Sequence, residues 1–271
     1  MTDMRLVIMG AAGRMGRMLV KSVSETPGCT LCAALEHPDS IALGQDAGLL
    51  AGCGRLNVPI TSDVEIALEG AHGIVDFTTP TVSAGLARLA AAAGLVHVVG
   101  TTGLSEEDLA GLREAGSGAR VVQSGNMSLG VNLLAGLVRK VAQTLGEEFD
   151  IEILEMHHRA KVDAPSGTAL LLGEAAAEGR GVALKSAKVA ARDGHTGARN
   201  PGDIGFAVLR GGSVVGEHTV IFAGGGERIE LSHRADDRAL FARGALKAAL
   251  WAKDRPPGFY SMADVLGLND L

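Results

Sequence analysis

Residues 6–16, Leu-Val-Ile-Met-Gly-Ala-Ala-Gly-Arg-Met-Gly, decide the fold that this sequence predicts. Four apolar residues form a short strand that runs directly into a turn with glycine at every third position. Gly10 permits the tight turn, Gly13 lets a ligand approach the backbone, and Gly16 allows the following helix to pack closely. A strand, a glycine-rich turn and an amphipathic helix in this order are the context of a dinucleotide-binding site.

An acidic residue supports this interpretation. Glu36 closes a second apolar stretch, residues 31–35, about twenty residues beyond the turn, where a carboxylate would meet the ribose hydroxyls of the cofactor. The spacing G-x-x-G-x-x-G is a variant of the usual fingerprint, so a glycine-rich turn of a different α/β fold stays the alternative. The turn residues expected to bind the cofactor are Gly10, Ala11, Ala12, Gly13, Arg14 and Met15.

The first half of the chain alternates strands and helices. Strands are predicted over residues 5–9, 31–35, 73–77, 96–99 and 120–123, and helices near 14–24, 63–69, 81–93 and 105–115. Such alternation predicts an α/β domain with a Rossmann-like, doubly wound parallel sheet, whose ligands bind beyond the carboxyl ends of the strands. Three motifs lie at such ends: Asp76-Phe77-Thr78, Gly100-Thr101-Thr102 and Ser124-Gly125-Asn126-Met127.

A second, smaller α+β domain is expected to follow a helix near 128–145. Its predicted parts are a strand over 150–158, a helix over 166–178, a long loop over 179–202, and antiparallel strands near 204–210, 213–223 and 227–234. Gly211-Gly212 and Gly224-Gly225-Gly226 would supply the turns between the last three strands. A sheet of four strands with one helix leaves an open face, which favours oligomerisation.

A helix over 236–253 is expected to return to the first domain. The predicted domains are therefore residues 1–128 with 236–271, which bind the dinucleotide, and residues 129–235, which bind substrate and form the oligomer.

Most of the chemistry lies in residues 155–168, Glu-Met-His-His-Arg-Ala-Lys-Val-Asp-Ala-Pro-Ser-Gly-Thr. Neighbouring residues of a strand point to opposite faces, so His157 and His158 are not expected to bind one atom together unless the strand has already ended. Lys161 adds a mobile cation. The segment suits a site that holds a small carboxylate and moves a proton on it, and the alternative is a solvated polar turn.

The end of this segment predicts an anion site. Pro165 favours an extended conformation at the residue before it, after which Ser166 can cap a new helix. The backbone N–H groups of Gly167 and Thr168 would then face an anion at the positive end of the helix dipole.

Taken together, these motifs resemble the dihydrodipicolinate reductase family, also called 4-hydroxy-tetrahydrodipicolinate reductase, over essentially the full length of the chain. The resemblance rests on GAAGRMG (10–16), ALE (34–36), DFT (76–78), GTTG (100–103), SGNMSLGVN (124–132), EMHHRAKVDAPSGTA (155–169), GHTG (194–197), GDIGFAVLRGG (202–212), VGEHTV (215–220) and DVLGLNDL (264–271). The segment 155–169 is specific, whereas many dehydrogenases share the glycine turn.

The resemblance implies an oxidoreductase that uses NADH or NADPH to reduce 4-hydroxy-tetrahydrodipicolinate to tetrahydrodipicolinate, with loss of water, on the diaminopimelate route to lysine. Because the unperturbed pKa of histidine is ~6.5, His157 is assigned as the main proton donor and Lys161 as the second. The substrate carboxylates are assigned to His158, Ser166, Gly167 and Thr168. The nicotinamide side of the cofactor site is assigned to Gly100, Thr101, Thr102, Ser124, Gly125, Asn126 and Met127.

Other charged and imidazole side chains are given weaker roles. Arg238 could meet a second substrate carboxylate or be a solvated arginine at a helix start. Arg159 is expected to make structural salt bridges. His195, His218 and His233 are expected to lie outside the substrate cluster and to have structural roles.

The cofactor preference is predicted from three positions. His37 follows Glu36, and Thr79 follows Asp76-Phe77-Thr78, where some members of the family carry arginine that could pair with the 2′-phosphate of NADPH. Glu36 itself repels that phosphate. We expect NADH to be used at least as well as NADPH, although Arg14 leaves dual use open.

The composition is typical of a globular enzyme. At 271 residues with 46% hydrophobic residues, the chain can bury a substantial core. A net charge of −6 argues against general nucleic-acid binding, and no apolar run has the length of a membrane span. No signal-peptide layout precedes Leu6, so a cytoplasmic enzyme is expected, and the family resemblance implies a homotetramer.

Three rival functions remain. A different nicotinamide enzyme of the same two-domain plan would act on an aldehyde or another amino-acid precursor. Aldehyde oxidation would need a catalytic cysteine, but Cys29, Cys32 and Cys53 all lie far from the substrate motifs and are expected to be ordinary thiols. A nucleotide sensor would not need both His157 and Lys161. A metal hydrolase built on two adjacent histidines lacks an H-E-x-x-H helix and a third ligand, so no metal is predicted.

Overall fold

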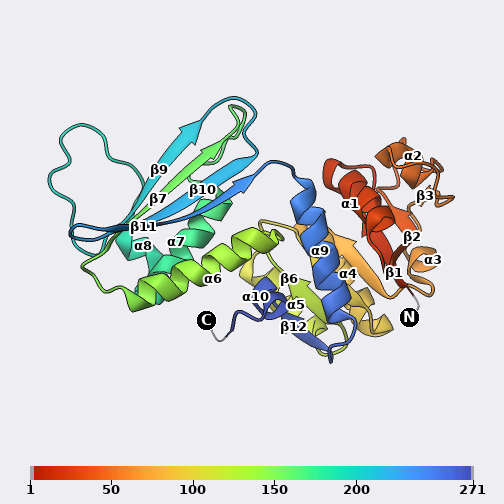
Figure 1. Cartoon of the computed structure of the whole chain (residues 1–271). Helices are drawn as coiled ribbons and strands as arrows, with labels where there is room; N and C mark the ends of the chain where they lie inside the picture. The colour runs from red at the N-terminus through yellow and green to blue at the C-terminus, as the bar shows by residue number, and fades with distance from the viewer. Residues whose placement is uncertain (1–2, 270–271) are drawn as a thin grey trace. The chain divides into compact units, whose positions relative to one another are not determined.

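The computed structural model describes residues 3–269 (Figure 1). These residues form two compact units, the first made of 3–128 and 239–266 and the second of 129–238 and 267–269. Among the described residues, no helix is long and apolar enough to cross a membrane.

The first unit is built on a seven-stranded sheet in the order β12-β6-β5-β4-β1-β2-β3. Its strands are β1 (Met4–Met9), β2 (Cys29–Leu35), β3 (Ile60–Thr61), β4 (Gly73–Asp76), β5 (Val96–Val99), β6 (Arg120–Gln123) and β12 (Gly258–Tyr260). Every pairing in this sheet is parallel. The predicted doubly wound parallel sheet is confirmed, and the short edge strands β3 and β12 are additions to the five strands predicted.

Helices cover both faces of this sheet (Figure 1). The helices of the first unit are α1 (Arg14–Glu25), α2 (Ala47–Ala51), α3 (Val64–Leu68), α4 (Pro80–Ala93), α5 (Glu106–Ala115), α9 (Ala239–Ala252) and α10 (Met262–Leu266). Residues of α3, α4 and α5 share one hydrophobic core with Val7 and Ile74 of the sheet, and α1 packs against α9. Burial on both faces explains why the strands are nearly continuous apolar runs.

The second unit contains a five-stranded sheet in the order β11-β10-β7-β9-β8. Its strands are β7 (Asp150–His157), β8 (Lys188–Val189), β9 (Ile204–Arg210), β10 (Gly216–Ala223) and β11 (Arg228–Ala235). The helices α6 (Leu129–Thr144), α7 (Gly167–Gly179) and α8 (Leu184–Ala187) lie on one side of it (Figure 1).

The predicted hairpin between residues 204–210 and 213–223 is wrong. β7 lies between β9 and β10, parallel to β9 and antiparallel to β10. Gly211 directly follows β9 and donates its N–H to the carbonyl of His157 at the end of β7. The glycine pair therefore continues the pairing of β9 with β7 and does not form a hairpin turn to β10. The prediction of four strands with one helix is also corrected, because α8 and β8 lie within the expected loop and α6 packs against α7.

Strand alternation places the functional side chains of this unit. On β7, Ile151 and Ile153 point into the core beneath the helices, and the same face continues at Glu155 and His157. On β10, Phe222 and Val220 point into that core and His218 follows them on the same face. The buried face is therefore apolar at one end and carries a carboxylate and two imidazoles at the other.

Candidate functional site

The glycine turn of the first unit is shaped by close backbone contacts. Gly10 has φ +62°, and a Cβ atom on Gly16 would lie 2.0 Å from the carbonyl oxygen of Gly10. Gly13 is the N-cap of α1 and provides no side-chain capping bond. The first N–H groups of a helix have no carbonyl partner within it, so this turn can receive the pyrophosphate of a dinucleotide.

Glu36 lies beside the turn, as predicted. Its Oε2 accepts a hydrogen bond from the N–H of Ala12 at 2.9 Å, and its Oε1 accepts one from the N–H of His37 at 3.0 Å. The imidazole of His37 lies within 3.5 Å of Asp39 and is largely exposed. The carboxylate of Glu36 is thus oriented by the backbone at the position where a ribose would be read.

The ends of β4 and β5 are joined through one buried carboxylate. Asp76 accepts hydrogen bonds from the N–H and hydroxyl of Thr78 and from the hydroxyl of Ser83, which also contacts Thr101 at 2.8 Å. Burial raises the pKa of Asp76, but interactions with His97, Ser83 and Thr78 outweigh it and leave that pKa below its usual value. This carboxylate holds the two expected cofactor loops together.

The third expected cofactor loop, residues 124–127, is held by hydrogen bonds of its own. The hydroxyl of Ser124 donates to the carbonyl of Asn126 at 2.7 Å, and the side-chain oxygen of Asn126 accepts from the N–H of Ser128 at 2.8 Å. Phe77 has a packing contact with Gly100. A Cβ on Gly100 would lie only 2.3 Å from the ring of Phe77, which supports a packing role for Phe77.

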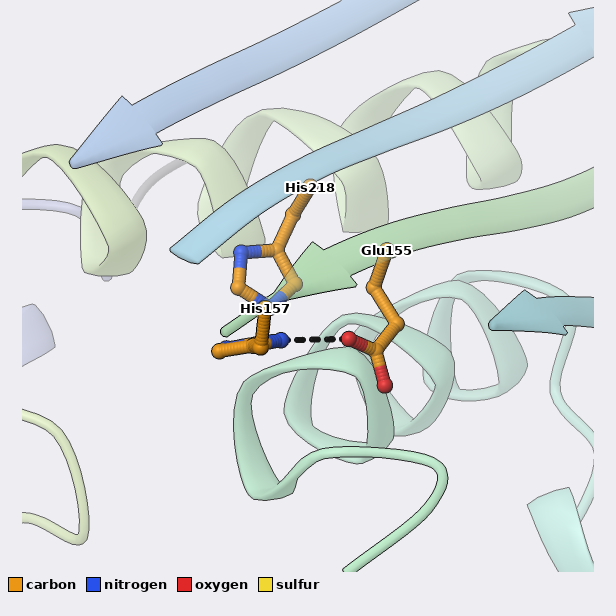
Figure 2. Close-up of side chains that lie close together, drawn as sticks. All are labelled: Glu155, His157 and His218. Carbon is orange, nitrogen blue, oxygen red and sulfur yellow. Dashed lines mark hydrogen bonds and ion pairs between the residues drawn. The ribbon is translucent and has the colours of Figure 1, made fainter. Parts of the chain in front are cut away.

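In the second unit, Glu155 is the centre of a buried polar cluster (Figure 2). Its Oε2 meets Nδ1 of His157, and its Oε1 accepts from the N–H of Ser166 at 2.9 Å. Arg210 donates from Nη1 to Oε2 at 2.9 Å and from Nη2 to Oε1 at 3.1 Å. Burial raises the pKa of Glu155, but these donors outweigh it, so the pKa lies below its ordinary value and the carboxylate is ionised.

The two buried imidazoles pack edge to face. The rings of His157 and His218 have centroids 5.0 Å apart at an interplanar angle of 73°. Burial and the nearby His157 lower the pKa of His218 to about 4. Burial also lowers the pKa of His157, and the cations Lys161 and Arg210 add to this effect against the opposing influence of Glu155.

The start of α7 joins this cluster as predicted. Ser166 caps the helix, its hydroxyl accepting from the N–H of Ala169 at 3.1 Å and lying 3.1 Å from Nε2 of His218. Gly167 and Thr168 form the first turn of the helix.

The remaining predicted substrate residues flank the cluster. Nζ of Lys161 lies 2.8 Å from Asp163, and this pairing lowers the pKa of the Asp163 carboxyl. His158 directly follows the end of β7 and is half-buried, and its Nε2 accepts from Nη2 of Arg238 at 3.3 Å.

Two sequence interpretations are corrected. His218 lies inside the cluster and not outside it, because β10 pairs with β7 and brings it beside His157. Arg159 is exposed and makes no ion pair with any residue of the range 3–269. Sequence reasoning also missed Arg210: it lies in the motif GDIGFAVLRGG (202–212), but only the unexpected pairing of β9 with β7 brings it to Glu155.

A carboxylate with two imidazoles is also the composition of a zinc site. Here, however, Arg210 donates to both oxygens of Glu155, and a divalent cation would have to displace that guanidinium. An ionised Glu155 paired with Arg210 is suited to accepting hydrogen bonds from N–H groups, among them that of the His157 imidazole.

Comparisons with known proteins identify the family of this chain. Residues 4–127 match the family model described as dihydrodipicolinate reductase, N-terminus, and residues 130–266 match the model of its C-terminus. A protein of Methylocella silvestris named 4-hydroxy-tetrahydrodipicolinate reductase is 66% identical over 100% of this chain and 99% of its own length. A protein of the same name from Beijerinckia indica is 64% identical over 99% of both chains.

Solved structures share the fold. Dipicolinate-bound dihydrodipicolinate reductase from Paenisporosarcina sp. TG-14 has a TM-score of 0.77 at 23% identity and covers 97% of this chain and 99% of its own. An amine dehydrogenase from Mycobacterium smegmatis has a TM-score of 0.61 at 14% identity, with 96% and 95% covered. The two family models together span nearly all of the described residues, and the curated relatives match at full length. The chain therefore belongs to the dihydrodipicolinate reductase family.

Proposed function

We propose that this chain catalyses the NAD(P)H-dependent reduction of 4-hydroxy-tetrahydrodipicolinate to tetrahydrodipicolinate, with loss of water, in the diaminopimelate route to lysine. The family membership supports the reaction, since the curated relatives carry the name of this reductase. The observation that carries the proposal for the site is the buried His157, with Lys161 and the start of α7 in the same short segment.

The substrate carries two carboxylates, and the second unit offers two cationic regions for them. Lys161 and the first turn of α7, at Gly167 and Thr168, form one region, because a helix N-terminus favours an anion. His158 with Arg238 forms the other. We assign substrate binding to His158, Ser166, Gly167 and Thr168, with Arg238 as an additional contact.

His157 and Lys161 supply the proton that the reduced ring requires. The pKa of His157 is lowered in the free protein by burial and by the nearby cations. Two substrate carboxylates in this site would favour the protonated imidazole, because an opposite charge nearby stabilises the charged form. Substrate binding would thus prepare the proton donor, and Lys161 would offset negative charge that develops on the ring.

The first unit fits a nicotinamide dinucleotide, which when bound supplies the hydride. The fit rests on the tight, side-chain-free backbone of the turn at Gly10 and Gly16 and on the start of α1, which has no side-chain cap. We assign cofactor binding to Gly10, Ala11, Ala12, Gly13, Arg14, Met15, Glu36, Gly100, Thr101, Thr102, Ser124, Gly125, Asn126 and Met127. Because Glu36 is oriented toward the turn and the neighbouring residue is His37 and not an arginine, we expect NADH to be used at least as well as NADPH.

The location and assembly are also proposals. We infer a cytoplasmic homotetramer in which the second units associate. Leu154, Met156 and Ile221 lie on the sheet face opposite the core, and Leu209, which pairs with Met156, is exposed on the neighbouring strand β9. Light scattering at several protein concentrations would measure the mass, and a monomer at every concentration would contradict this assembly.

The reaction is tested by mixing aspartate semialdehyde, pyruvate and a purified condensing synthase, and then adding this protein with NADH or NADPH. We expect rapid loss of nicotinamide absorbance with NADH and a rate no greater with NADPH. If neither cofactor is oxidised although both bind, the reductase proposal is wrong. If NADPH is favoured tenfold or more in kcat/KM, only the interpretation of Glu36 and His37 fails.

A further inference from the structure

Glu155 and His157 are two residues apart on β7, so both side chains point to the same buried face (Figure 2). Both residues are buried there: Glu155 is 1% exposed and His157 is 7% exposed. The contact between them is through Nδ1 of the imidazole.

The carboxylate of Glu155 can only accept hydrogen bonds. Arg210 donates to both of its oxygens and the N–H of Ser166 donates to Oε1. A bidentate guanidinium favours the ionised carboxylate and fixes its plane. Because an ionised carboxylate cannot donate, the hydrogen in its contact with His157 is carried by Nδ1.

This arrangement determines which nitrogen of His157 can exchange a proton. With Nδ1 committed to Glu155, Nε2 is the remaining nitrogen. A Cβ on residue 216 would lie 3.0 Å from Nε2, so a glycine there leaves this side of the nitrogen free of a side chain. His218 packs against the ring edge to face and limits its rotation.

We propose that Glu155, held by Arg210, is a positioning residue that fixes the orientation and tautomer of His157, so that Nε2 presents the proton to the substrate. The proposal rests on the donor role of His157 proposed above. Arg210 acts through Glu155, because its guanidinium keeps the carboxylate ionised and fixes its plane. Arg210 also donates to the carbonyl of Asp163 at 2.7 Å, so the loop after β7 is bound to the same guanidinium.

The charges around His157 predict opposite effects for the two partners. The titratable and charged groups around the ring are Glu155 on β7, Lys161 in the following loop, Arg210 on β9, His218 on β10 and, opposite His218, His233 on β11. Glu155 raises the pKa of His157, whereas Arg210 lowers it. Removing the carboxylate charge should therefore lower that pKa, and removing the guanidinium charge should raise it.

The test is a histidine NMR titration of the full-length protein together with steady-state kinetics. The His157 signals are assigned by their loss in His157→Gln. We expect Glu155→Gln to move the His157 titration to lower pH and Arg210→Met to move it to higher pH. In Glu155→Gln, kcat should fall roughly a hundredfold, within the range that general acid catalysis contributes, while the NADH dissociation constant stays unchanged. Glu155→Asp, which keeps the charge, should recover part of kcat.

A matched control is available on the same strand. Glu152 pairs with Arg192 and Arg199 on the opposite face of β7, so Glu152→Gln removes a similar ion pair without touching His157. We expect it to leave the His157 titration and kcat unchanged. Because Glu155→Gln removes the carboxylate partner of the half-buried Arg210, the double variant Glu155→Gln with Arg210→Met is measured as well. Its thermal midpoint should return toward the original value while kcat stays low.

Two results would overturn the proposal. One is a His157 titration that does not move, or moves in the same direction, in Glu155→Gln and Arg210→Met. The other is a folded double variant with the original kcat. A His157→Gln protein that retains full activity would instead remove the donor role, and the NMR titration would still decide whether Glu155 and Arg210 set the tautomer and pKa of the ring.

Discussion

The hydroxyl of Ser166 lies 3.1 Å from Nε2 of His218, which joins the cap of α7 to the buried imidazole pair. The same hydroxyl accepts from the N–H of Ala169, and the backbone N–H of Ser166 donates to Glu155. One small residue thus connects the expected anion site at the helix start with the expected proton donor.

Replacing Ser166 by alanine tests this connection. We expect the free energy of unfolding to fall by about 1 kcal/mol through loss of the cap, and KM for the substrate to rise roughly tenfold, with a smaller change in kcat. Urea unfolding and initial rates would measure these quantities. Ser105→Ala removes the comparable cap of α5 and should reduce stability without changing KM. An unchanged KM in Ser166→Ala would contradict a substrate role for this residue.

His218 predicts a pH dependence of stability. Its pKa is lowered to about 4 in the folded protein, whereas the ordinary value is 6.5. Between these values the unfolded chain binds more protons, so the free energy of unfolding falls as the pH is lowered from about 6.5 to about 4. The contribution of His218 is at most about 3 kcal/mol, since one pKa unit corresponds to 1.36 kcal/mol.

The measurement compares urea unfolding of the original protein with that of His218→Gln at pH 7.5 and at pH 5. The difference in stability between the two pH values should be smaller in the variant, because glutamine does not titrate. An equal difference in both proteins would show that His218 is not buried as a neutral imidazole.

The cofactor site predicts that its preference can be changed by two exposed substitutions. His37→Arg and Thr79→Arg together place two cations where a 2′-phosphate would be read, and neither position is tied by a buried hydrogen bond. We expect the ratio of kcat/KM for NADPH over NADH to rise roughly tenfold or more, which corresponds to about 1.4 kcal/mol. Thermal stability serves as the control and should change little. A ratio that stays constant would remove these positions from cofactor recognition.

The glycine turn makes a steric prediction. In Gly16→Ala the new Cβ would lie 2.0 Å from the carbonyl oxygen of Gly10, so the turn or α1 must shift. We expect a loss of about 1–3 kcal/mol in stability and at least a tenfold weaker NADH affinity by fluorescence titration. Gly85→Ala, in α4 with open space around its Cβ, should be stabilising by roughly 0.5–1 kcal/mol. NADH binding by Gly16→Ala at the original affinity would contradict the assigned role.

Local features of this molecule could be predicted from its sequence. The glycine turn depends on neighbouring residues, and so does the cap at Ser166, because a polar residue at a helix start bonds to the backbone within three positions. Strand alternation holds along the predicted strand as far as His157, which lies on the buried face, and the strand ends there, before His158. These features follow from geometry within a few residues of the chain.

Features that depend on strand pairing could not be predicted in the same way. Arg210 reaches Glu155 only because β9 lies parallel to β7, and His218 reaches Ser166 only because β10 lies on the other side of β7. The glycine pair at residues 211–212 has the composition of a hairpin turn and misled the prediction of this pairing. The two-residue strand β8 and the three-residue strand β12 are too short for a periodic pattern.

The central claim is that His157 and Lys161 supply the proton in the reduction. Its most direct test is the single-turnover loss of NADH absorbance at saturating substrate in the original protein, His157→Gln and Lys161→Met, with NADH affinity measured in parallel. We predict that each variant oxidises NADH at least roughly a hundredfold more slowly than the original protein. The NADH affinity should be unchanged. A His157→Gln protein that oxidises NADH at the original rate would contradict the claim.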